Sequence, residues 1–553
     1  RSNPGGTCGG FLCYIQRRTM RFAGGRGGKC GMPEGGWIAP AKRRIQPETE
    51  GGAIRPVEEL FMKSFIVKAA LCFSIAAFCS AQPSGHRPGK FAGGPEAPVP
   101  PYIVTHIPSE AGGDTGIAVG VLPPLKPRYA EGAPVVIEVP GGANLGAAEG
   151  PSDYAGMGFV EILFAFPGGG RGKGISGGAY DQRGPHCVRA LADVIRFATG
   201  RLADTQGRTI QDLVPQFPVL TANAGIVGSS HGGNACGRVM AVHGGEFPDL
   251  AFYASMESPY GEGNVNIELG GRDQGVNPAY HAETGVLDLS KLAWANELTP
   301  GPPQRWRNEK RGVGADLKGA LYFDLNGDGT FTEANDFLAN TFVQDLGQGP
   351  KTWYSPRLIR EAESRKLFGD TRPAHIPSLS ESTEYWQWRD ASGSISEAVK
   401  QCPNAAVIVY ANERDHVQVA PDHPHILTQE EGFRNAGCKF VRLNPDKSYV
   451  ERILQNGPIG RKKPVLHFPD NDAGMAWDRT NIRTGLEPEA LPIRLYMQAA
   501  VAELADRTQS KNWSKNLDAI LYADAPYEAV APMRRDRRSK GDVSPPPPPT
   551  PPA

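Results

Sequence analysis

A serine between two glycines stands where an apolar strand is expected to turn into a helix. The segment Gly228-Ser-Ser230-His-Gly232 fits the pattern Gly-x-Ser-x-Gly, with apolar residues 225–228 before it and a small-residue helix from Gly233 after it. A nucleophile elbow needs such a turn, because glycines on either side allow the close approach that lifts the hydroxyl above the sheet. A serine hydroxyl is a weak nucleophile and needs a neighbouring base. The pattern therefore predicts a nucleophile at Ser230, with a Gly/Ser-rich turn without chemistry as the alternative.

The elements around this serine alternate between strands and helices. Helices are expected at residues 188–198, from Gly233 through Val239, around Phe433 and at residues 492–505. Apolar strands that alternate with helices indicate a mostly parallel sheet covered by helices on both faces. The expected strands are residues 133–139, 160–166, 225–228, 250–256, 405–410 and 439–443.

This arrangement resembles the α/β-hydrolase superfamily, in its secreted bacterial serine esterase and prolyl-oligopeptidase-like branch. The resemblance covers residues 100–257 and 401–530, which would form the two parts of the core. It implies the α/β-hydrolase fold, with residues 258–400 inserted as a lid between core strands. It also implies a catalytic serine, an acid and a histidine in that order along the chain.

The acid and the base are placed by the resemblance. Asp415 matches the acid position just past the strand 405–410, with Glu413 as a second candidate. His467 is the only histidine beyond residue 425, and it would be the base, oriented by Asp415. Three histidines precede the strand 439–443 and are weaker candidates for the base: His416, His423 and His425.

The oxyanion that forms during acyl transfer needs preorganised donors. The backbone N–H of His231, the residue after the nucleophile, would supply one donor, while the His231 ring would take no part. The loop Pro140-Gly141-Gly142-Ala143 resembles the oxyanion loop of the family and would supply another.

The insertion carries a string typical of calcium loops. Residues 324–336 place oxygen-bearing side chains at positions 1, 3 and 5 and a glycine at position 6, as in an EF-hand. Position 12 is Asn335, so Asp336 or Glu333 would have to close the site; a double turn without metal is the alternative. No cofactor is expected for catalysis, and the expected ligands of a structural Ca²⁺ are Asp324, Asn326, Asp328, Thr330 and Asp336.

The N-terminal region looks like a leader followed by an export signal. Residues 62–81 have lysines, a short apolar run and small residues before Gln82, which is the layout of a secretory signal peptide. Residues 1–61 would be a non-native or disordered leader, 82–99 a Pro/Gly-rich lead-in and 531–553 a disordered Pro-rich tail. The apolar run is too short to span a membrane. The layout of a signal peptide therefore predicts a secreted or periplasmic protein.

The charge balance and the cysteine spacing argue against two further kinds of function, nucleic-acid binding and zinc binding. The 59 Lys and Arg balance 59 Asp and Glu, which argues against a nucleic-acid-binding protein. Four cysteines follow the proposed signal, without the Cys-x-x-Cys spacing of a zinc site. Export would permit a disulfide, for which Cys402 and Cys438 are the best pair.

These observations favour a secreted serine hydrolase that cleaves carboxylic esters, either small molecules or ester groups linked to a polymer. One alternative is a serine peptidase of the prolyl-oligopeptidase type, although the 18 residues from Gln82 to Val99 cannot form the propeller that precedes such a domain. The other is a non-catalytic, calcium-dependent binding protein on a hydrolase scaffold. The tryptophans of the insertion would either suit an aromatic or carbohydrate-linked ester or form the insertion's own core.

Overall fold

The computed structural model describes most of the chain from residue 101 onward. The described residues are 101–261, 268–271, 274–300, 317–339, 341–411, 415, 418–456, 493–513, 522 and 525–526. The expected leader, signal segment and tail lie outside them, and so does His467.

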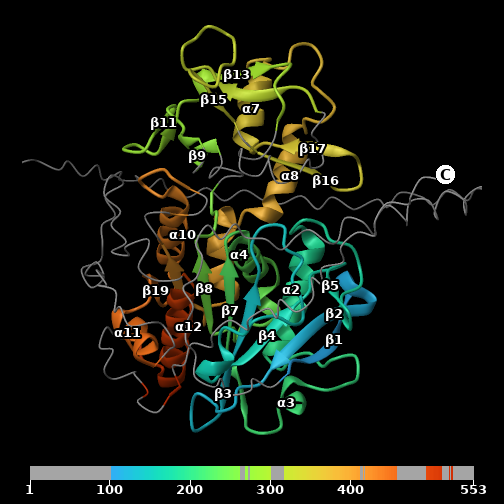
Figure 1. The fold of residues 1–553 in the computed structure, drawn as a ribbon, viewed down its shortest axis with the longest axis vertical. Helices are drawn as coiled ribbons and strands as arrows, with labels where there is room; N and C mark the ends of the chain where they lie inside the picture. Colours follow the sequence, from blue (N-terminus) through green and yellow to red (C-terminus); the bar gives the residue numbers. More distant parts are fainter. Residues whose placement is uncertain are drawn as a thin grey trace, which may run out of the picture. The chain divides into compact units, whose positions relative to one another are not determined.

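The core is an eight-stranded sheet with the order β1-β2-β4-β3-β7-β8-β18-β19 (Figure 1). From β4 to β19 all neighbours are parallel, while β2 runs antiparallel to both β1 and β4. This order and these directions define the α/β-hydrolase fold, as the sequence predicted. The strands are β1 (Ile103–Ser109), β2 (Gly113–Leu122), β3 (Ala133–Val139), β4 (Val160–Phe164), β7 (Val219–Ser229), β8 (Phe252–Met256), β18 (Ala406–Tyr410) and β19 (Val441–Leu443).

Helices cover both faces of the sheet, and each face has its own apolar cluster. On one face Ile137 of β3 and Ile226 of β7 share a cluster with α2, α4, α9 and α10. On the other face Val136 and Val227, one residue along each strand, pack with α11 and α12. The alternation of side chains along each strand thus produces two buried faces. The helices are α2 (Pro185–Ala198), α3 (Ile210–Leu213), α4 (His231–His243), α9 (Ile395–Gln401), α10 (Pro424–Asn435), α11 (Lys447–Asn456) and α12 (Ile493–Ser510).

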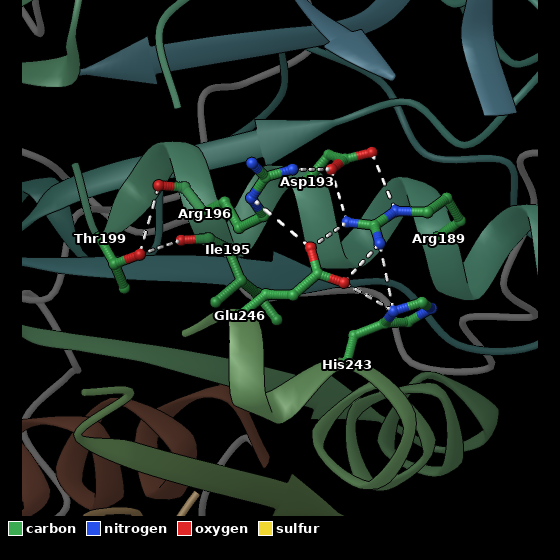
Figure 2. A network of polar contacts seen from close by, with 7 residues as sticks. All are labelled: Arg189, Asp193, Ile195, Arg196, Thr199, His243 and Glu246. Atoms are coloured by element: carbon green, nitrogen blue, oxygen red, sulfur yellow. Dashed lines mark hydrogen bonds and ion pairs between the residues drawn. The ribbon is translucent and has the colours of Figure 1, made fainter. Parts of the chain in front are cut away.

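An ion-pair network joins α2 to the C-terminal end of α4 (Figure 2). The Arg189 guanidinium binds Asp193 one turn along α2 and Glu246 beyond α4, both at 2.6 Å. The hydrogen bond from Arg189 lowers the pKa of the Glu246 carboxyl to about 2. His243 contacts the same carboxylate at 2.9 Å. The network fixes the far end of the helix whose first turn follows Ser230.

Two edge strands and the extent of β7 differ from the sequence-based expectation. No strand was expected at β1 or β2, which form an antiparallel pair at the edge of the sheet. The strand before the elbow begins at Val219, where polar residues precede the apolar run, and not at Gly225.

The expected disulfide between Cys402 and Cys438 is wrong, because the four described cysteines are all free. Each thiol contacts a different carbonyl: Met240 O for Cys402 and Ala405 O for Cys438. Burial raises the pKa of the Cys402 thiol to about 12, which is typical of a structural cysteine.

The insertion between β8 and β18 builds small antiparallel sheets and two helices around a separate apolar cluster. Its tryptophans Trp353 and Trp386 are buried, and their indole nitrogens donate to the carbonyls of Gln344 and Tyr354. These two tryptophans therefore belong to the core of the insertion. Its elements are β9 (Gly270–Gly271), β10 (Gly275–Val276), β11 (Tyr280–His281), β12 (Val286–Leu287), β13 (Leu292–Ala295), β14 (Ala320–Phe323), β15 (Phe337–Leu338), β16 (Phe342–Asp345), β17 (Pro350–Trp353), α7 (Pro356–Ser364) and α8 (Leu379–Arg389). A short hairpin, β5 (Gly170–Arg171) and β6 (Gly174–Ile175), lies in the core part of the chain.

Among the helices that the structure describes, none is long and apolar enough to cross a membrane.

Candidate functional site

Ser230 occupies a strained turn between β7 and α4. It has φ +50° and ψ −125°, a backbone conformation that residues other than glycine rarely adopt. Its backbone N–H donates to Met256 O at 2.7 Å, and its carbonyl accepts from Gly233 N at 2.8 Å. The turn is therefore held from β8 on one side and from the first turn of α4 on the other. Such imposed strain at a serine that begins a helix is the geometry of a nucleophile elbow.

The glycines around Ser230 cannot be replaced by larger residues without a shift of the structure, because a Cβ at these positions would clash with neighbouring backbone or side-chain atoms. A Cβ at Gly232 would lie 2.4 Å from the carbonyl oxygen of Val139, at the end of β3. A Cβ at Gly233 would lie 1.7 Å from the Ser258 hydroxyl, and one at Gly228 would lie 2.5 Å from Gly233 Cα. Because no Cβ fits at these positions, the glycines allow α4 to approach the strands closely.

The loop expected to bind the oxyanion lies directly beside the elbow. A Cβ at Gly141 would lie 2.6 Å from Ser229 O and 3.1 Å from Ser230 Cβ. Gly142 has φ +55°, in the left-handed region that favours glycine. The structure thus brings three expected site residues together: Ser230, Gly141 and the neighbouring Gly142.

The His231 side chain is unsuited to act as the base. Its Nε2 lies 3.2 Å from the carbonyl oxygen of Arg389, which can only accept a hydrogen bond. Burial, together with repulsion from Arg183 and Arg389, lowers the pKa of His231 to about 3. An efficient base has a pKa near the working pH. The backbone N–H of His231 is therefore the part of this residue that can serve the chemistry.

Asp415 lies on the loop after β18 and is paired with a histidine that sequence reasoning had ranked lower. Its Oδ2 is 2.9 Å from His425 Nε2, and both side chains are fully buried. Its Oδ1 accepts from the Gln418 backbone N–H at 3.0 Å. A carboxylate held in this way fixes the orientation of an imidazole. The expected partner, His467, lies outside the described residues, so this contact neither supports nor replaces it.

The other candidates for the acid and the base differ in what the structure describes. Glu413 and His416 lie outside the described residues. His423 precedes α10 with φ +40°, and burial followed by repulsion from His425 lowers its pKa to about 4. A pKa this low makes His423 a weaker base at neutral pH than a histidine with an ordinary pKa.

Three parts of the candidate site, namely the Gly141 loop, Ser230 and Asp415, follow the carboxyl ends of parallel strands. The loop with Gly141 follows β3, Ser230 follows β7 and Asp415 follows β18. Because parallel strands end at one edge of the sheet, their following loops meet there, and this edge is where open α/β sheets bind ligands. The arrangement explains how positions so far apart in the chain can form one site.

Both stems of the insertion contact the first turn of α4. From the first stem, the Tyr260 hydroxyl donates to Gly233 O at 3.3 Å. From the second, the Ala391 backbone N–H donates to Asn234 Oδ1 at 3.0 Å. The insertion is therefore anchored on the helix that begins at Ser230.

Two arginines near the site are functional candidates that the sequence does not predict. Arg183 donates to the carbonyl of Pro140 at 2.6 Å, and Arg389 donates to the carbonyl of Gln182 at 2.7 Å. Neither arginine belongs to a motif, so the sequence carried no signal for these contacts.

The expected calcium loop folds as a tight turn closed by its own carboxylates. Asp324 accepts from the backbone N–H of Gly327 at 2.7 Å and of Gly329 at 2.9 Å. Asp336 accepts from Leu325 N at 3.1 Å and Thr332 N at 2.7 Å, which joins the two ends of the loop.

Within the described residues, no group of three or more His, Cys, Asp or Glu side chains is placed to hold a metal ion. A site here would therefore depend on Asn326, Thr330 or backbone oxygens as well.

Replacing Gly141 with alanine is expected to lower kcat for acyl transfer by on the order of 10²-fold, as does the loss of one oxyanion donor. The reason is that the new Cβ would lie 2.6 Å from Ser229 O and would push the loop away from Ser230. The measurement is kcat together with the thermal midpoint. Gly393→Ala is the matched control, because a Cβ there has no neighbour within 4 Å. Equal kcat values for the two variants would contradict the placement of the loop.

Comparisons with known proteins place this chain with no family. No protein-family model and no curated protein sequence matches it. A carboxyl esterase from the fungus Tuber melanosporum is 12% identical, with a TM-score of 0.29, over 68% of this chain and 87% of that one. An arylesterase is 12% identical, with a TM-score of 0.30, over 63% and 77%. The Mycobacterium tuberculosis protein MPT51 is 13% identical, with a TM-score of 0.27, over 62% and 89%. Similarities this low carry no argument about activity, and the fold assignment rests on the strand order.

Proposed function

We propose that this protein is a serine hydrolase that cleaves carboxylic esters through an acyl-enzyme. The observation that carries the proposal is the backbone of Ser230, strained at φ +50° between β7 and α4. Backbone strain of about 1–3 kcal/mol persists only where surrounding contacts impose it, and it is common at catalytic residues. The adjacent Gly141 loop and the loop with Asp415 add support, because the proposed chemistry needs an oxyanion site and an acid next to the serine.

In the proposed reaction, Ser230 Oγ attacks the ester carbonyl carbon while a histidine takes its proton. The backbone N–H groups of His231 and of the Gly141 loop would bind the resulting oxyanion. The tetrahedral intermediate collapses to the acyl-enzyme, and the histidine returns the proton to the leaving alcohol. Water then repeats the sequence, so that the carboxylic acid is released and the Ser230 hydroxyl is restored.

The proposed base is His467, held by Asp415, on the ground of chain order in the resembling family. A specific contact favours His425 as the alternative, since its Nε2 lies 2.9 Å from Asp415 Oδ2. The two assignments make opposite predictions for the activity of single histidine variants.

An ester substrate is the proposed choice over a peptide. The test compares hydrolysis of p-nitrophenyl acetate with that of a peptide p-nitroanilide, using wild type and Ser230→Ala in parallel. Ser230-dependent hydrolysis of the ester, with the anilide turned over far more slowly, is the expected result. Faster turnover of the anilide would favour a peptidase, and the absence of Ser230-dependent hydrolysis of either substrate would favour a binding protein.

Export is part of the proposal, because residues 62–81 have the layout of a signal peptide. A substrate would then be met outside the cytoplasm, in the periplasm or the medium.

A structural Ca²⁺ in the insertion is also proposed, held by Asp324, Asn326, Asp328, Thr330 and Asp336. The carboxylate of Asp324 already organises the turn through Gly327 and Gly329, and oxygen ligands in such a loop suit Ca²⁺. The ion would stiffen the insertion and would not enter the chemistry.

Chelation of calcium is expected to lower the thermal midpoint and to raise KM together. Binding to the folded state alone stabilises it by RT ln(1 + [L]/Kd), so the midpoint should rise with added Ca²⁺. Melting curves and Michaelis plots with calcium and with chelator measure both effects on wild type, Asp324→Ala and the control Asp288→Asn. Asp288 also caps a turn of the insertion, through Ser290 N, but lies outside the loop. A wild type that shows neither effect would contradict the metal site.

A further inference from the structure

A buried arginine behind the expected oxyanion loop makes no ion pair with any residue that the structure describes. The side chain of Arg183 is 1% exposed, and within the described residues no carboxylate pairs with it. Its Nε and Nη1 lack any hydrogen-bond partner there. A buried cation without a counter-ion is costly, and proteins keep such a group only where other interactions compensate for the cost. Arg183 therefore needs a reason beyond stability.

All the hydrogen bonds that Arg183 makes through its side chain go to one loop. Its Nη2 lies 2.6 Å from Pro140 O, 2.8 Å from Asn144 O and 3.4 Å from Gly142 O. The guanidinium carbon lies 3.8 Å from the centre of the Phe166 ring, which supports the cation from one side. The positive charge is thus fixed against the carbonyls of the loop whose Gly141 abuts Ser230.

The backbone that carries Arg183 is strained and is held from the insertion. Gln182 and Arg183 have φ +57° and +69°, two successive non-glycine residues in the left-handed region. Arg389, the last residue of α8, donates to Gln182 O at 2.7 Å and to Asp181 O at 2.5 Å. These two hydrogen bonds help to hold the segment 181–183 in its strained conformation.

Arg389 also contacts the residue after Ser230, because its carbonyl oxygen accepts from His231 Nε2 at 3.2 Å. Within α8, its guanidinium carbon lies 3.9 Å from the centre of the Tyr385 ring. A single residue at the end of the insertion thus touches both the helix after Ser230 and the segment that holds Arg183. The insertion is connected in this way to both parts of the expected oxyanion site.

We propose that Arg183 is a positioning residue, which fixes the oxyanion loop through its carbonyls and adds a positive charge where the oxyanion forms, and that Arg389 ties this arrangement to the insertion. The inference rests on the proposed function. The proposal gives Arg183 a role in stabilising the transition state, because a fixed and buried charge stabilises developing negative charge more than it stabilises neutral substrate. The charge and the hydrogen bonds are separable by substitution.

Arg183→Met removes the charge and the hydrogen bonds at similar volume, and kcat should fall by on the order of 10²-fold with KM little changed. Arg183→Lys keeps the charge without the planar fork, and its kcat should lie between those of the Arg183→Met variant and the wild type. Arg389→Met should also lower kcat, but by less than Arg183→Met does. Each kcat is expressed per active site titrated to completion with a fluorophosphonate, so that unfolded protein does not enter the ratio.

A second measurement separates positioning from stability. An alkyl boronic acid forms a tetrahedral anion on the serine, so its affinity should fall in parallel with kcat across the three variants, while the KM for ester stays nearly constant. Arg507→Met is the matched control, since Arg507 is also 1% exposed but binds Glu503 on α12, away from the loop. It should lower the thermal midpoint and leave kcat per titrated site unchanged.

The inference is overturned if Arg183→Met and Arg183→Lys both keep kcat and boronate affinity within about threefold of wild type and lose only thermal stability. A wild type that hydrolyses no ester would instead overturn the proposed function, and this inference with it. The two failures are therefore distinguishable by the wild-type assay alone.

Discussion

Ser230→Ala is expected to lower kcat for ester hydrolysis by on the order of 10⁶-fold while leaving the fold intact. The substitution removes only the hydroxyl, and alanine meets the same backbone strain at φ +50° as serine does. Because no other atom replaces the nucleophile, the acyl-enzyme cannot form. Steady-state kinetics against p-nitrophenyl acetate, with a melting curve, measures both parts of the prediction.

Ser229→Ala is the matched control for this variant. Ser229 is the last residue of β7 and neighbours Ser230 in the same glycine-flanked segment. Its loss should change kcat by less than an order of magnitude. A Ser230→Ala enzyme that retains wild-type turnover, or a Ser229→Ala enzyme that loses it, would place the nucleophile elsewhere.

Asp415→Asn should lower kcat by on the order of 10⁴-fold, because an amide no longer holds the imidazole in the correct tautomer or stabilises the imidazolium. Asp422→Asn is the control: Asp422 is also buried on the loop after β18, but it accepts from the Tyr280 hydroxyl of the insertion. The two variants remove the same charge from one loop. Equal losses of kcat would mean that the loop, and not the Asp415 carboxylate, matters for catalysis.

Single histidine variants then identify the base. If His467 is the base, His467→Gln loses as much turnover as Asp415→Asn, and His425→Gln has a smaller effect through the orientation of Asp415. If His425 is the base, the order reverses. Near-normal kcat in both variants would contradict both assignments of the base.

The sequence was sufficient to predict the parts of the site that depend on local steric rules. The elbow was predictable because Gly228, Gly232 and Ser230 stand close together in the chain, and the structure confirms why no Cβ fits at the two glycines. The parallel part of the sheet was predictable because its strands are short apolar runs with breaks after them. The edge strands β1 and β2 were missed because β2 is glycine-rich and β1 contains polar residues and a proline.

The contacts that could not be predicted join segments far apart in the chain. The hydrogen bond from Arg389 to Gln182 spans 207 positions, and the one from Arg183 to Pro140 spans 43. No periodicity or motif marks an arginine that binds backbone carbonyls, since any carbonyl in reach serves. The contact between Asp415 and His425 is likewise not predicted, because His425 precedes the last core strand and chain order in the resembling family favours a later histidine as the base.

The central claim, that Ser230 is an activated nucleophile, is tested most directly by covalent labelling with a fluorophosphonate followed by mass mapping of the modified residue. The expected result is one adduct per wild-type molecule, located on Ser230 and absent from Ser230→Ala, with Ser229→Ala labelled as wild type. An adduct on another residue, or no labelling of a folded wild-type protein, would contradict the account.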